Sequence, residues 1–142
     1  MAEFETILFD VADHVATITF NRPERLNATN DTSRRELGEA WGIVRDDPEI
    51  RVAIITGAGD RAFSAGQDIR ATSESGIRNK VPGSRLHHDC WKPVICALNG
   101  MCVGGGLHQV ADSDLILMAD HAELLDTHCV VGNGTSSDYC AY

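Results

Sequence analysis

Residues 99–114 read NGMCVGGGLHQVADSD and contain four glycines within seven positions. An apolar run at residues 94–98 (VICAL) precedes them, and its composition predicts a buried strand. We therefore expect a strand that turns into a helix through glycines. The first N–H groups of a helix lack partners within the helix, and the helix dipole makes that end mildly positive. Because glycine lets an anionic or anion-forming atom approach the main chain, the stretch predicts a site that stabilises an oxyanion.

A second glycine bend lies at residues 63–69 (FSAGQDI). It follows a predicted strand at residues 52–56 and a turn at residues 57–60, and it precedes a polar stretch predicted to be helical from about Asp68. Two backbone N–H groups aimed at one carbonyl oxygen are what acyl or enolate chemistry requires, because negative charge grows on that oxygen in the transition state. The two bends therefore predict two convergent donors.

Three motifs, in this order and spacing, resemble the enoyl-CoA hydratase/isomerase (crotonase) superfamily. They are Asn21-Arg22-Pro23 with Leu26-Asn27-Ala28, then Phe63 to Ile69, then Asn99-Gly100 with Gly104-Gly105-Gly106. The resemblance covers roughly residues 5 to 132 and implies an α/β fold, a crotonase-like spiral of ββα units. In that family two backbone N–H groups form the oxyanion hole, and the resemblance places them on Gln67 and Gly105.

The resemblance also implies an acyl-CoA thioester as the ligand, with no cofactor beyond the CoA moiety of that substrate. Arg22 and Arg25 flank the loop that runs along the CoA in relatives, where a guanidinium can meet a phosphate. Arginines in turns are commonly only solvated, so both alternatives stay open. The candidate CoA-binding residues are Arg22, Arg25, Leu26, Ala28, Ala65, Gly66, Asp68 and Ile69.

Hydratases of this family carry two glutamates as acid and base, and the resemblance places His108 and His128 at their positions. A histidine pair can move a proton because imidazole titrates near neutrality, and Asp126 or Asp112 can orient a ring. His108 and Asp112 stand four positions apart, on one face of the expected helix. The alternative is that each histidine only packs at the cavity wall. The candidate catalytic residues are Gln67, Gly105, His108, His128 and Asp126.

Other interpretations of the glycine cluster fit less well. A dinucleotide fingerprint needs GxGxxG near the first strand with an acidic residue about twenty positions later, and a P-loop needs Gly-Lys-Ser/Thr. Neither pattern occurs. Close helix packing alone would explain an isolated cluster, but the matching bend at residues 65–68 lowers the weight of that interpretation.

Composition predicts one compact cytoplasmic domain. The chain has 142 residues, is 43% hydrophobic and 23% charged, and carries a net charge of −9, which argues against nucleic acid or an anionic membrane surface as a partner. The N-terminus is acidic where a signal peptide would be basic, and no apolar run approaches the length of a membrane span.

No metal site is predicted. The five cysteines form no CxxC pair, which disfavours both a disulfide framework and a zinc site, and most are expected to be buried apolar residues. The run His87-His88-Asp89-Cys90 has no second ligand cluster, so a solvated helix face is the favoured interpretation.

Hydrophobic periodicity predicts the remaining elements. Residues 5–10 and 14–20 form a hairpin, and a helix capped by Ser33 with Glu36 runs to Arg45 before Asp47-Pro48 stops it. A helical stretch is expected at residues 84–91 and a further strand at residues 115–119.

The last residues depart from the family. Relatives continue with another spiral turn and with C-terminal helices used for trimer assembly, whereas residues 133–142 are rich in Asn, Gly, Ser and Thr without apolar periodicity. We expect a spiral core at residues 1–132, truncated before the helical trimerisation region, and an irregular tail; a shifted reading frame, a short isoform and a fragment stay open as causes.

The expected function is that of an enoyl-CoA hydratase or isomerase, a lyase or isomerase of fatty acid metabolism that forms a homo-oligomer, a trimer or hexamer. The alternative is a non-catalytic relative that binds CoA or serves only as a folding or assembly module.

Overall fold

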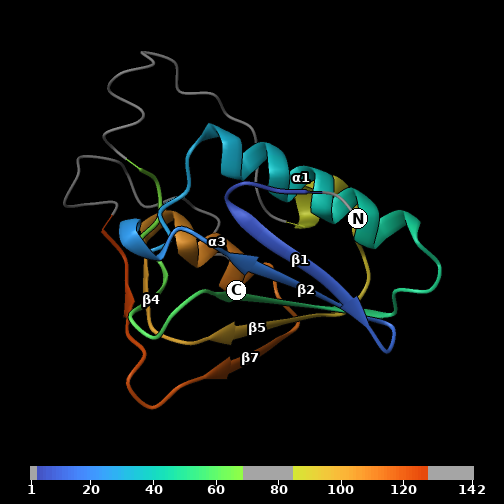
Figure 1. Ribbon diagram of the computed structural model, residues 1–142. Helices are drawn as coiled ribbons and strands as arrows, with labels where there is room; N and C mark the ends of the chain where they lie inside the picture. The colour runs from blue at the N-terminus through green and yellow to red at the C-terminus, as the bar shows by residue number, and fades with distance from the viewer. Residues whose placement is uncertain (1–2, 69–84, 128–142) are drawn as a thin grey trace.

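A computed structural model describes residues 3–68 and 85–127 of the chain, which form two sheets and the helices that pack on them (Figure 1). The larger sheet has five strands in the order β1-β2-β3-β5-β7, and the smaller has three in the order β4-β6-β8. The larger sheet consists of β1 (Ile7–Ala12), β2 (Val15–Phe20), β3 (Val52–Gly57), β5 (Val94–Leu98) and β7 (Leu115–Met118). The smaller consists of β4 (Ala62–Ser64), β6 (Met101–Val103) and β8 (Leu124–Leu125). The α-helices are α1 (Asp31–Asp46) and α3 (Leu107–Ala111), and the 3-10 turns are η1 (Pro23–Arg25), η2 (Arg85–His88) and η3 (Gly104–Gly106).

Successive strand pairs wind through both sheets. The pairs are β3 with β4, β5 with β6, and β7 with β8; the first strand of each joins the larger sheet and the second joins the smaller. Apart from the antiparallel hairpin of β1 and β2, neighbouring strands are parallel. This repeat confirms the predicted α/β spiral. The smaller sheet was not predicted, because strands of two or three residues are too short to show periodicity.

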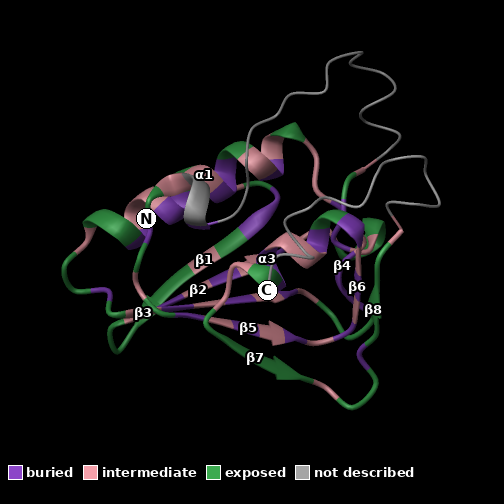
Figure 2. Cartoon of the chain, turned by 180° about the vertical axis from the view of Figure 1, so that it is seen from behind, coloured by how far each residue is buried: buried purple, intermediate pink, exposed green. Residues whose placement is uncertain are grey.

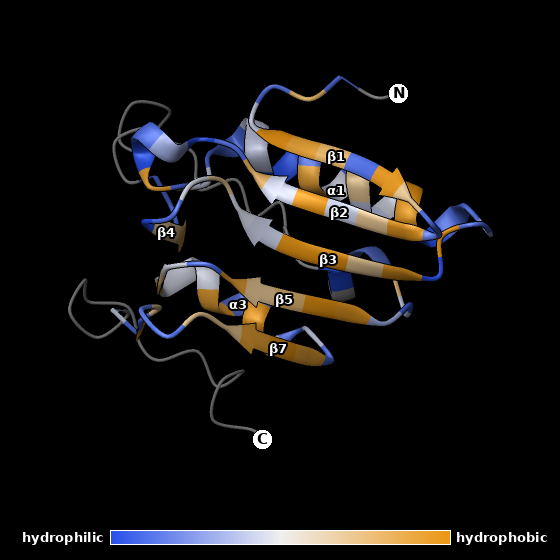
Figure 3. Ribbon diagram, turned by 60° about the horizontal axis from the view of Figure 1, so that its bottom comes forward, coloured by the Kyte–Doolittle hydropathy of each residue, from blue (hydrophilic) through white to orange (hydrophobic). Residues whose placement is uncertain are grey.

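The core lies on one face of the larger sheet. Alternate residues of β2, β3 and β5 are buried, as the two-residue period of a strand requires. Leu37, Trp41 and Val44 of α1 belong to the same buried cluster. In Figure 3 the five strands lie in front of both α1 and α3, so the two helices cover the same face.

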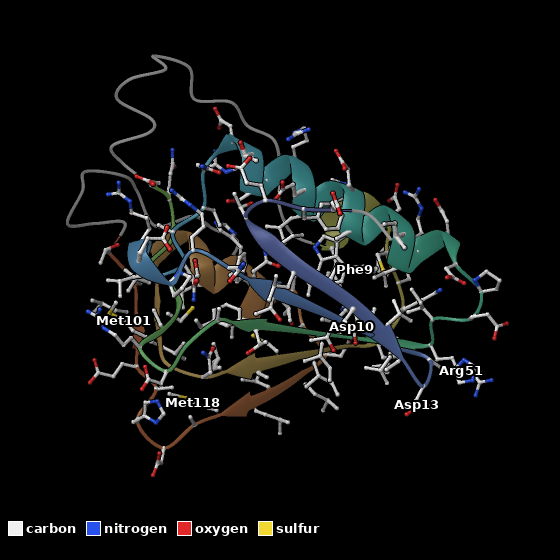
Figure 4. All side chains as sticks on the ribbon, viewed as in Figure 1. Phe9, Asp10, Asp13, Arg51, Met101 and Met118 are labelled. Carbon is white, nitrogen blue, oxygen red and sulfur yellow. The ribbon has the colours of Figure 1, made fainter. Side chains whose placement is uncertain are left out.

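The hairpin turn is tighter than predicted. β1 starts at Ile7, and the turn consists of Asp13 and His14, whose φ angles are 49° and 68°. Such a two-residue turn matches the twist of the strands that it joins, so His14 lies in the turn and not in a strand. Figure 4 shows Asp13 beside Arg51, where β2 and β3 begin, at the opposite end of the molecule from Met101.

The cap of α1 also differs from the prediction. Asn30 is the N-cap, and its side chain accepts a hydrogen bond of 2.8 Å from the backbone N–H of Ser33. Glu36 is buried and instead accepts bonds from the backbone N–H groups of Glu5 and Thr6, each at 2.9 Å, and from the Thr6 hydroxyl at 2.5 Å. Its carboxylate therefore joins the N-terminal segment to the helix.

The segment around His88 is not a solvated helix face. A Cβ atom added at Gly38 of α1 would lie 2.8 Å from the His88 ring, so η2 packs closely on α1.

Cys90, Cys96 and Cys102 are buried free thiols, in agreement with the sequence-based expectation, while Cys129 and Cys140 lie outside the described residues. Among the described helices, none is long and apolar enough to cross a membrane.

β7 forms an exposed apolar edge of the larger sheet (Figure 2). Its four residues are between 49% and 64% exposed. In β5, by contrast, Val94, Cys96 and Leu98 are buried. These three residues point into the core, as expected of the buried strand that the apolar run at residues 94–98 predicts.

Glu36 is predicted to stabilise the fold above acidic pH. Burial raises the pKa of its carboxyl, but the bonds from Thr6 and Glu5 outweigh this, so the pKa lies below its ordinary value. The stabilisation is therefore present above that ordinary value and is lost as the pH falls through the folded-state pKa. Glu36→Gln should lower the free energy of unfolding at pH 7 by about 1–3 kcal/mol, with a smaller difference at acidic pH, in urea titrations. Glu39→Gln, on the exposed face of α1, serves as the control; equal effects of the two changes would contradict this role.

The exposed β7 edge is predicted to promote self-association, because contiguous apolar surface drives it. Light scattering should show concentration-dependent association of the 142-residue chain, and Leu115→Lys with Leu117→Lys should reduce it. Glu39→Lys changes the net charge by the same amount without touching the strand. A monomer at every concentration would refute the prediction.

Candidate functional site

The candidate residues lie at the carboxyl ends of the strands of the smaller sheet. β4 pairs with β6 and β6 with β8, all in parallel, so the three strands end at the same edge. β4 leads into residues 65–67, β6 leads into η3, and β8 leads into Asp126 and Thr127. The two glycine bends found in the sequence are therefore the loops that follow two neighbouring strands.

The bends make close contact. A Cβ atom added at Gly66, where φ is +83°, would lie 2.7 Å from the Val103 carbonyl oxygen and 2.9 Å from the Gly105 nitrogen. A Cβ atom added at Gly105 would lie 3.6 Å from the Gln67 nitrogen. Both Gln67 and Gly105 are exposed. Only glycine fits at position 66. Because it has no Cβ atom, the two predicted donors, the N–H groups of Gln67 and Gly105, can lie close together at the surface.

A hydrogen bond fixes the orientation of the Gln67 peptide. The carbonyl of Gly66, which belongs to the same peptide group as the Gln67 nitrogen, accepts a bond of 2.7 Å from the Thr29 N–H. The Asp68 N–H donates to the Thr29 carbonyl at 2.9 Å, completing a parallel bridge between Thr29 and Gln67. Because a trans peptide points its C=O and N–H in opposite directions, the Gln67 N–H points away from Thr29.

Asn27 and Ser64 hold the surrounding loops. Asn27 is buried, and its side-chain amide donates to the carbonyls of Ala58 and Ala62 at 3.0 and 2.7 Å. The Ser64 hydroxyl donates to the Asn27 carbonyl at 2.9 Å and accepts from the Gly66 N–H at 3.2 Å. In the sequence, Asn27 stands out only as part of a motif, and no pattern identifies Ser64 or Thr29 as supports of the bend. The one available signal for the role of Ser64 is its position as a polar residue at the end of the strand that precedes the bend.

The two candidate arginines have different surroundings. Arg22 donates to Asp68 from both terminal nitrogens, at 3.2 and 3.1 Å, and to the Ala28 carbonyl at 2.6 Å. Arg25 is exposed at the end of η1. A small hollow beside this loop has a volume of about 60 Å³ and is lined by parts of residues 23–27 and 58–62, without Gln67 or Gly105. The two predicted donors therefore lie on open surface, outside that hollow.

Only some of the predicted proton-transfer groups lie within the described residues. His108 is half-buried in the first turn of α3, and its carbonyl accepts the Asp112 N–H at 3.0 Å. Asp126 is exposed just beyond β8. Thr127 reaches the glycine turn, since a Cβ atom added at Gly104 would lie 3.2 Å from its hydroxyl oxygen. Ile69, His128 and residues 133–142 lie outside the described residues.

Cys102 of β6 lies behind the glycine turn. A Cβ atom added at Gly106 would lie 3.1 Å from its sulfur and 2.9 Å from the Ser64 carbonyl oxygen. Burial raises the pKa of the Cys102 thiol to about 12, so this group stays protonated at neutral pH. It therefore acts as a packing residue and not as a nucleophile.

Comparison with known proteins identifies the relatives of this chain. The Enoyl-CoA hydratase/isomerase family model matches residues 10–137. An (E)-benzylidenesuccinyl-CoA hydratase from Thauera aromatica is 38% identical over 124 residues, which is 82% of this chain and 48% of that protein. A carnitinyl-CoA dehydratase from Escherichia coli K12 is 40% identical over 114 residues, which is 76% of this chain and 43% of that protein.

Solved structures agree with the sequence matches. An enoyl-CoA hydratase/isomerase from Mycobacterium paratuberculosis superposes with a TM-score of 0.86 at 30% identity, covering 97% of this chain and 57% of that one. The chain spans about half the length of the curated relatives it matches.

Gly66→Ala is predicted to disturb the site and the fold together. The added Cβ would clash with Val103 and Gly105 and would stand at a φ that alanine disfavours, so the free energy of unfolding should fall by about 1–3 kcal/mol. The amide resonance of Gly105 should shift in the same variant. Gly42→Ala is the control, because nothing lies within 4 Å of its added Cβ, and it should instead raise stability by about 0.5–1 kcal/mol. Wild-type stability with an unmoved Gly105 amide in Gly66→Ala would show that the bends do not meet in this way.

Proposed function

Because this chain belongs to the enoyl-CoA hydratase/isomerase family, we propose that it binds an acyl-CoA thioester and stabilises the enolate form of the acyl group through the backbone N–H groups of Gln67 and Gly105. The observation that carries the proposal is the contact between the two glycine bends, which brings these two nitrogens close together on an exposed surface. The side chain of Gln67 is incidental to this role.

Two main-chain donors suit the chemistry of a thioester. When electrons move onto the carbonyl group, the oxygen gains negative charge, and N–H groups already held in place stabilise it without reorganising. The orientation of the Gln67 peptide by Thr29 supports such preorganisation. Because main-chain N–H groups can stabilise the charge by themselves, the site needs no cationic side chain at the reacting oxygen.

Addition of water to an enoyl-CoA, or its reverse, is the reaction that the relatives favour, because their names are those of a hydratase and a dehydratase. In this reaction a base takes a proton from water while the water oxygen bonds to the β-carbon. The electron pair of the C=C bond moves onto the thioester oxygen, between the two donors, and the α-carbon then accepts a proton as the carbonyl reforms. Isomerisation of the double bond would begin instead with loss of a proton from the α-carbon, and the resulting dienolate would place negative charge on the same thioester oxygen before the γ-carbon accepts a proton.

Histidines are proposed to transfer the protons. The resemblance assigns the positions of the family's acid and base to His108 and His128, with Asp126 as the group that orients His128. The contact of Thr127 with the glycine turn supports this assignment, because His128 is the next residue in the chain. Imidazole is suited to the task because its pKa lies near neutrality.

The nucleotide part of CoA is proposed to lie along the loop before α1, where exposed Arg25 is the phosphate-binding candidate. No cofactor beyond CoA is needed for this chemistry. A homo-oligomer is proposed for the assembly. A non-catalytic CoA-binding module is the second candidate function, and the observation that favours it is that the chain spans about half the length of its relatives.

Gly105→Pro is the variant that tests the proposed donors, because proline removes the N–H group. Any turnover of an enoyl-CoA should fall by about two to three orders of magnitude, while Gln67→Ala, which keeps its N–H, should have a mild effect. Calorimetry with acetyl-CoA measures binding in both variants, and circular dichroism confirms that each is folded. A large loss in Gln67→Ala would show that the side chain carries the role. Absence of binding by the folded wild type at millimolar CoA would leave only a scaffold.

A further inference from the structure

We propose that the ion pair between Arg22 and Asp68 positions the Gln67 donor and neutralises the carboxylate beside it, and that Arg22 is not a ligand for the CoA phosphates. This inference rests on the proposed function, because the donor matters only where a thioester oxygen binds. It reassigns two residues that the sequence alone placed among the ligands of CoA.

The contacts of Arg22 are directed into the protein. Its guanidinium donates to Asp68 at 3.2 and 3.1 Å and to the Ala28 carbonyl at 2.6 Å. The two side chains are only 17% and 12% exposed. A guanidinium that is held by a carboxylate and a carbonyl, and is largely shielded from water, presents little positive potential to an incoming phosphate.

Hydrogen bonds also hold the residues immediately before and after Gln67. Gly66 and Asp68 are each bonded to Thr29 through the main chain. Arg22 then binds the Ala28 carbonyl, one residue before Thr29, and the Asp68 side chain, one residue after Gln67. The ion pair therefore closes a ring of hydrogen bonds around the bridge between Thr29 and Gln67. Opening that ring would let the Gln67 N–H rotate, so that it would no longer point at the same oxygen as the Gly105 N–H.

Charge gives Arg22 a second effect. Asp68 directly follows the proposed oxyanion donor in the chain, so its Cα atom lies about 3.8 Å from that of Gln67. An uncompensated negative charge on the neighbouring residue would oppose the growth of negative charge on the thioester oxygen. Pairing with Arg22 removes most of that repulsion. Loss of Arg22 should therefore harm an enolate more than it harms a neutral ligand.

The test compares CoA with acetoacetyl-CoA, whose β-keto thioester forms an enolate with a distinct ultraviolet absorbance. In Arg22→Gln the affinity for acetoacetyl-CoA and the fraction of bound enolate should fall about tenfold to a hundredfold, while the affinity for CoA changes less than about twofold. In the double variant Arg22→Gln with Asp68→Asn, both pairing groups are neutral, so the part of the loss that comes from the uncompensated Asp68 charge should be recovered. Arg35→Gln removes an equal charge from an exposed pair with Glu39 and serves as the control.

Three results would overturn the proposal. An equal loss of CoA and acetoacetyl-CoA affinity in Arg22→Gln would identify a phosphate ligand. A loss of both together with a lower melting temperature, not recovered in the double variant, would identify a purely structural residue. If wild type binds neither ligand, the proposed function fails, and the ligand-free protein then decides the positioning role: an unchanged chemical shift and hydrogen exchange of the Gln67 amide in Arg22→Gln would refute it, and a change in both would support it.

Discussion

The contact of Gly66 with Val103 and Gly105 is the constraint on which the rest of the site depends. Backbone atoms of two loops approach so closely there that a single methyl group would collide with both residues. The smaller sheet makes the approach possible, because its parallel strands deliver both loops to one edge. Hydrogen bonds to Thr29 then set the direction of the Gln67 peptide, so that the position of one N–H is decided by main-chain geometry and not by a flexible side chain.

The surrounding polar groups hold this geometry without presenting strong charge to it. Asn27 and Ser64 bind carbonyl and N–H groups of three loops from buried positions, where a lost partner would leave an unsatisfied polar group. Arg22 and Asp68 compensate each other's charge at the edge of the bend. The larger sheet and α1 supply the apolar core beneath these loops, and the site is thereby carried by short segments anchored to rigid strands.

The sequence predicted the elements whose patterns are long enough to read. Strands were predicted at the observed places from the alternating residues of β2 and from the apolar run of β5. A helix was predicted from the apolar face of α1. β4, β6 and β8 escaped prediction because two or three residues carry no period. The cap of α1 was misplaced because Ser33 and Glu36 imitate a capping box, whereas Asn30 is the cap and Glu36 serves the N-terminal segment. The meeting of the two bends was predicted from their motifs, but the pairing of Arg22 with Asp68 depends on contacts between residues 46 positions apart, which no local pattern reveals.

The Gln67 and Gly105 N–H groups are proposed to bind one oxygen, that of the thioester carbonyl. A crystal structure of this protein with a bound acyl-CoA tests it most directly, because the distances can be read from the thioester oxygen itself. We expect this oxygen to lie about 2.7–3.2 Å from both nitrogens, with the Gly66 carbonyl still accepting its hydrogen bond from the Thr29 N–H. A thioester oxygen that contacts a side chain, or only one of the two nitrogens, would contradict it.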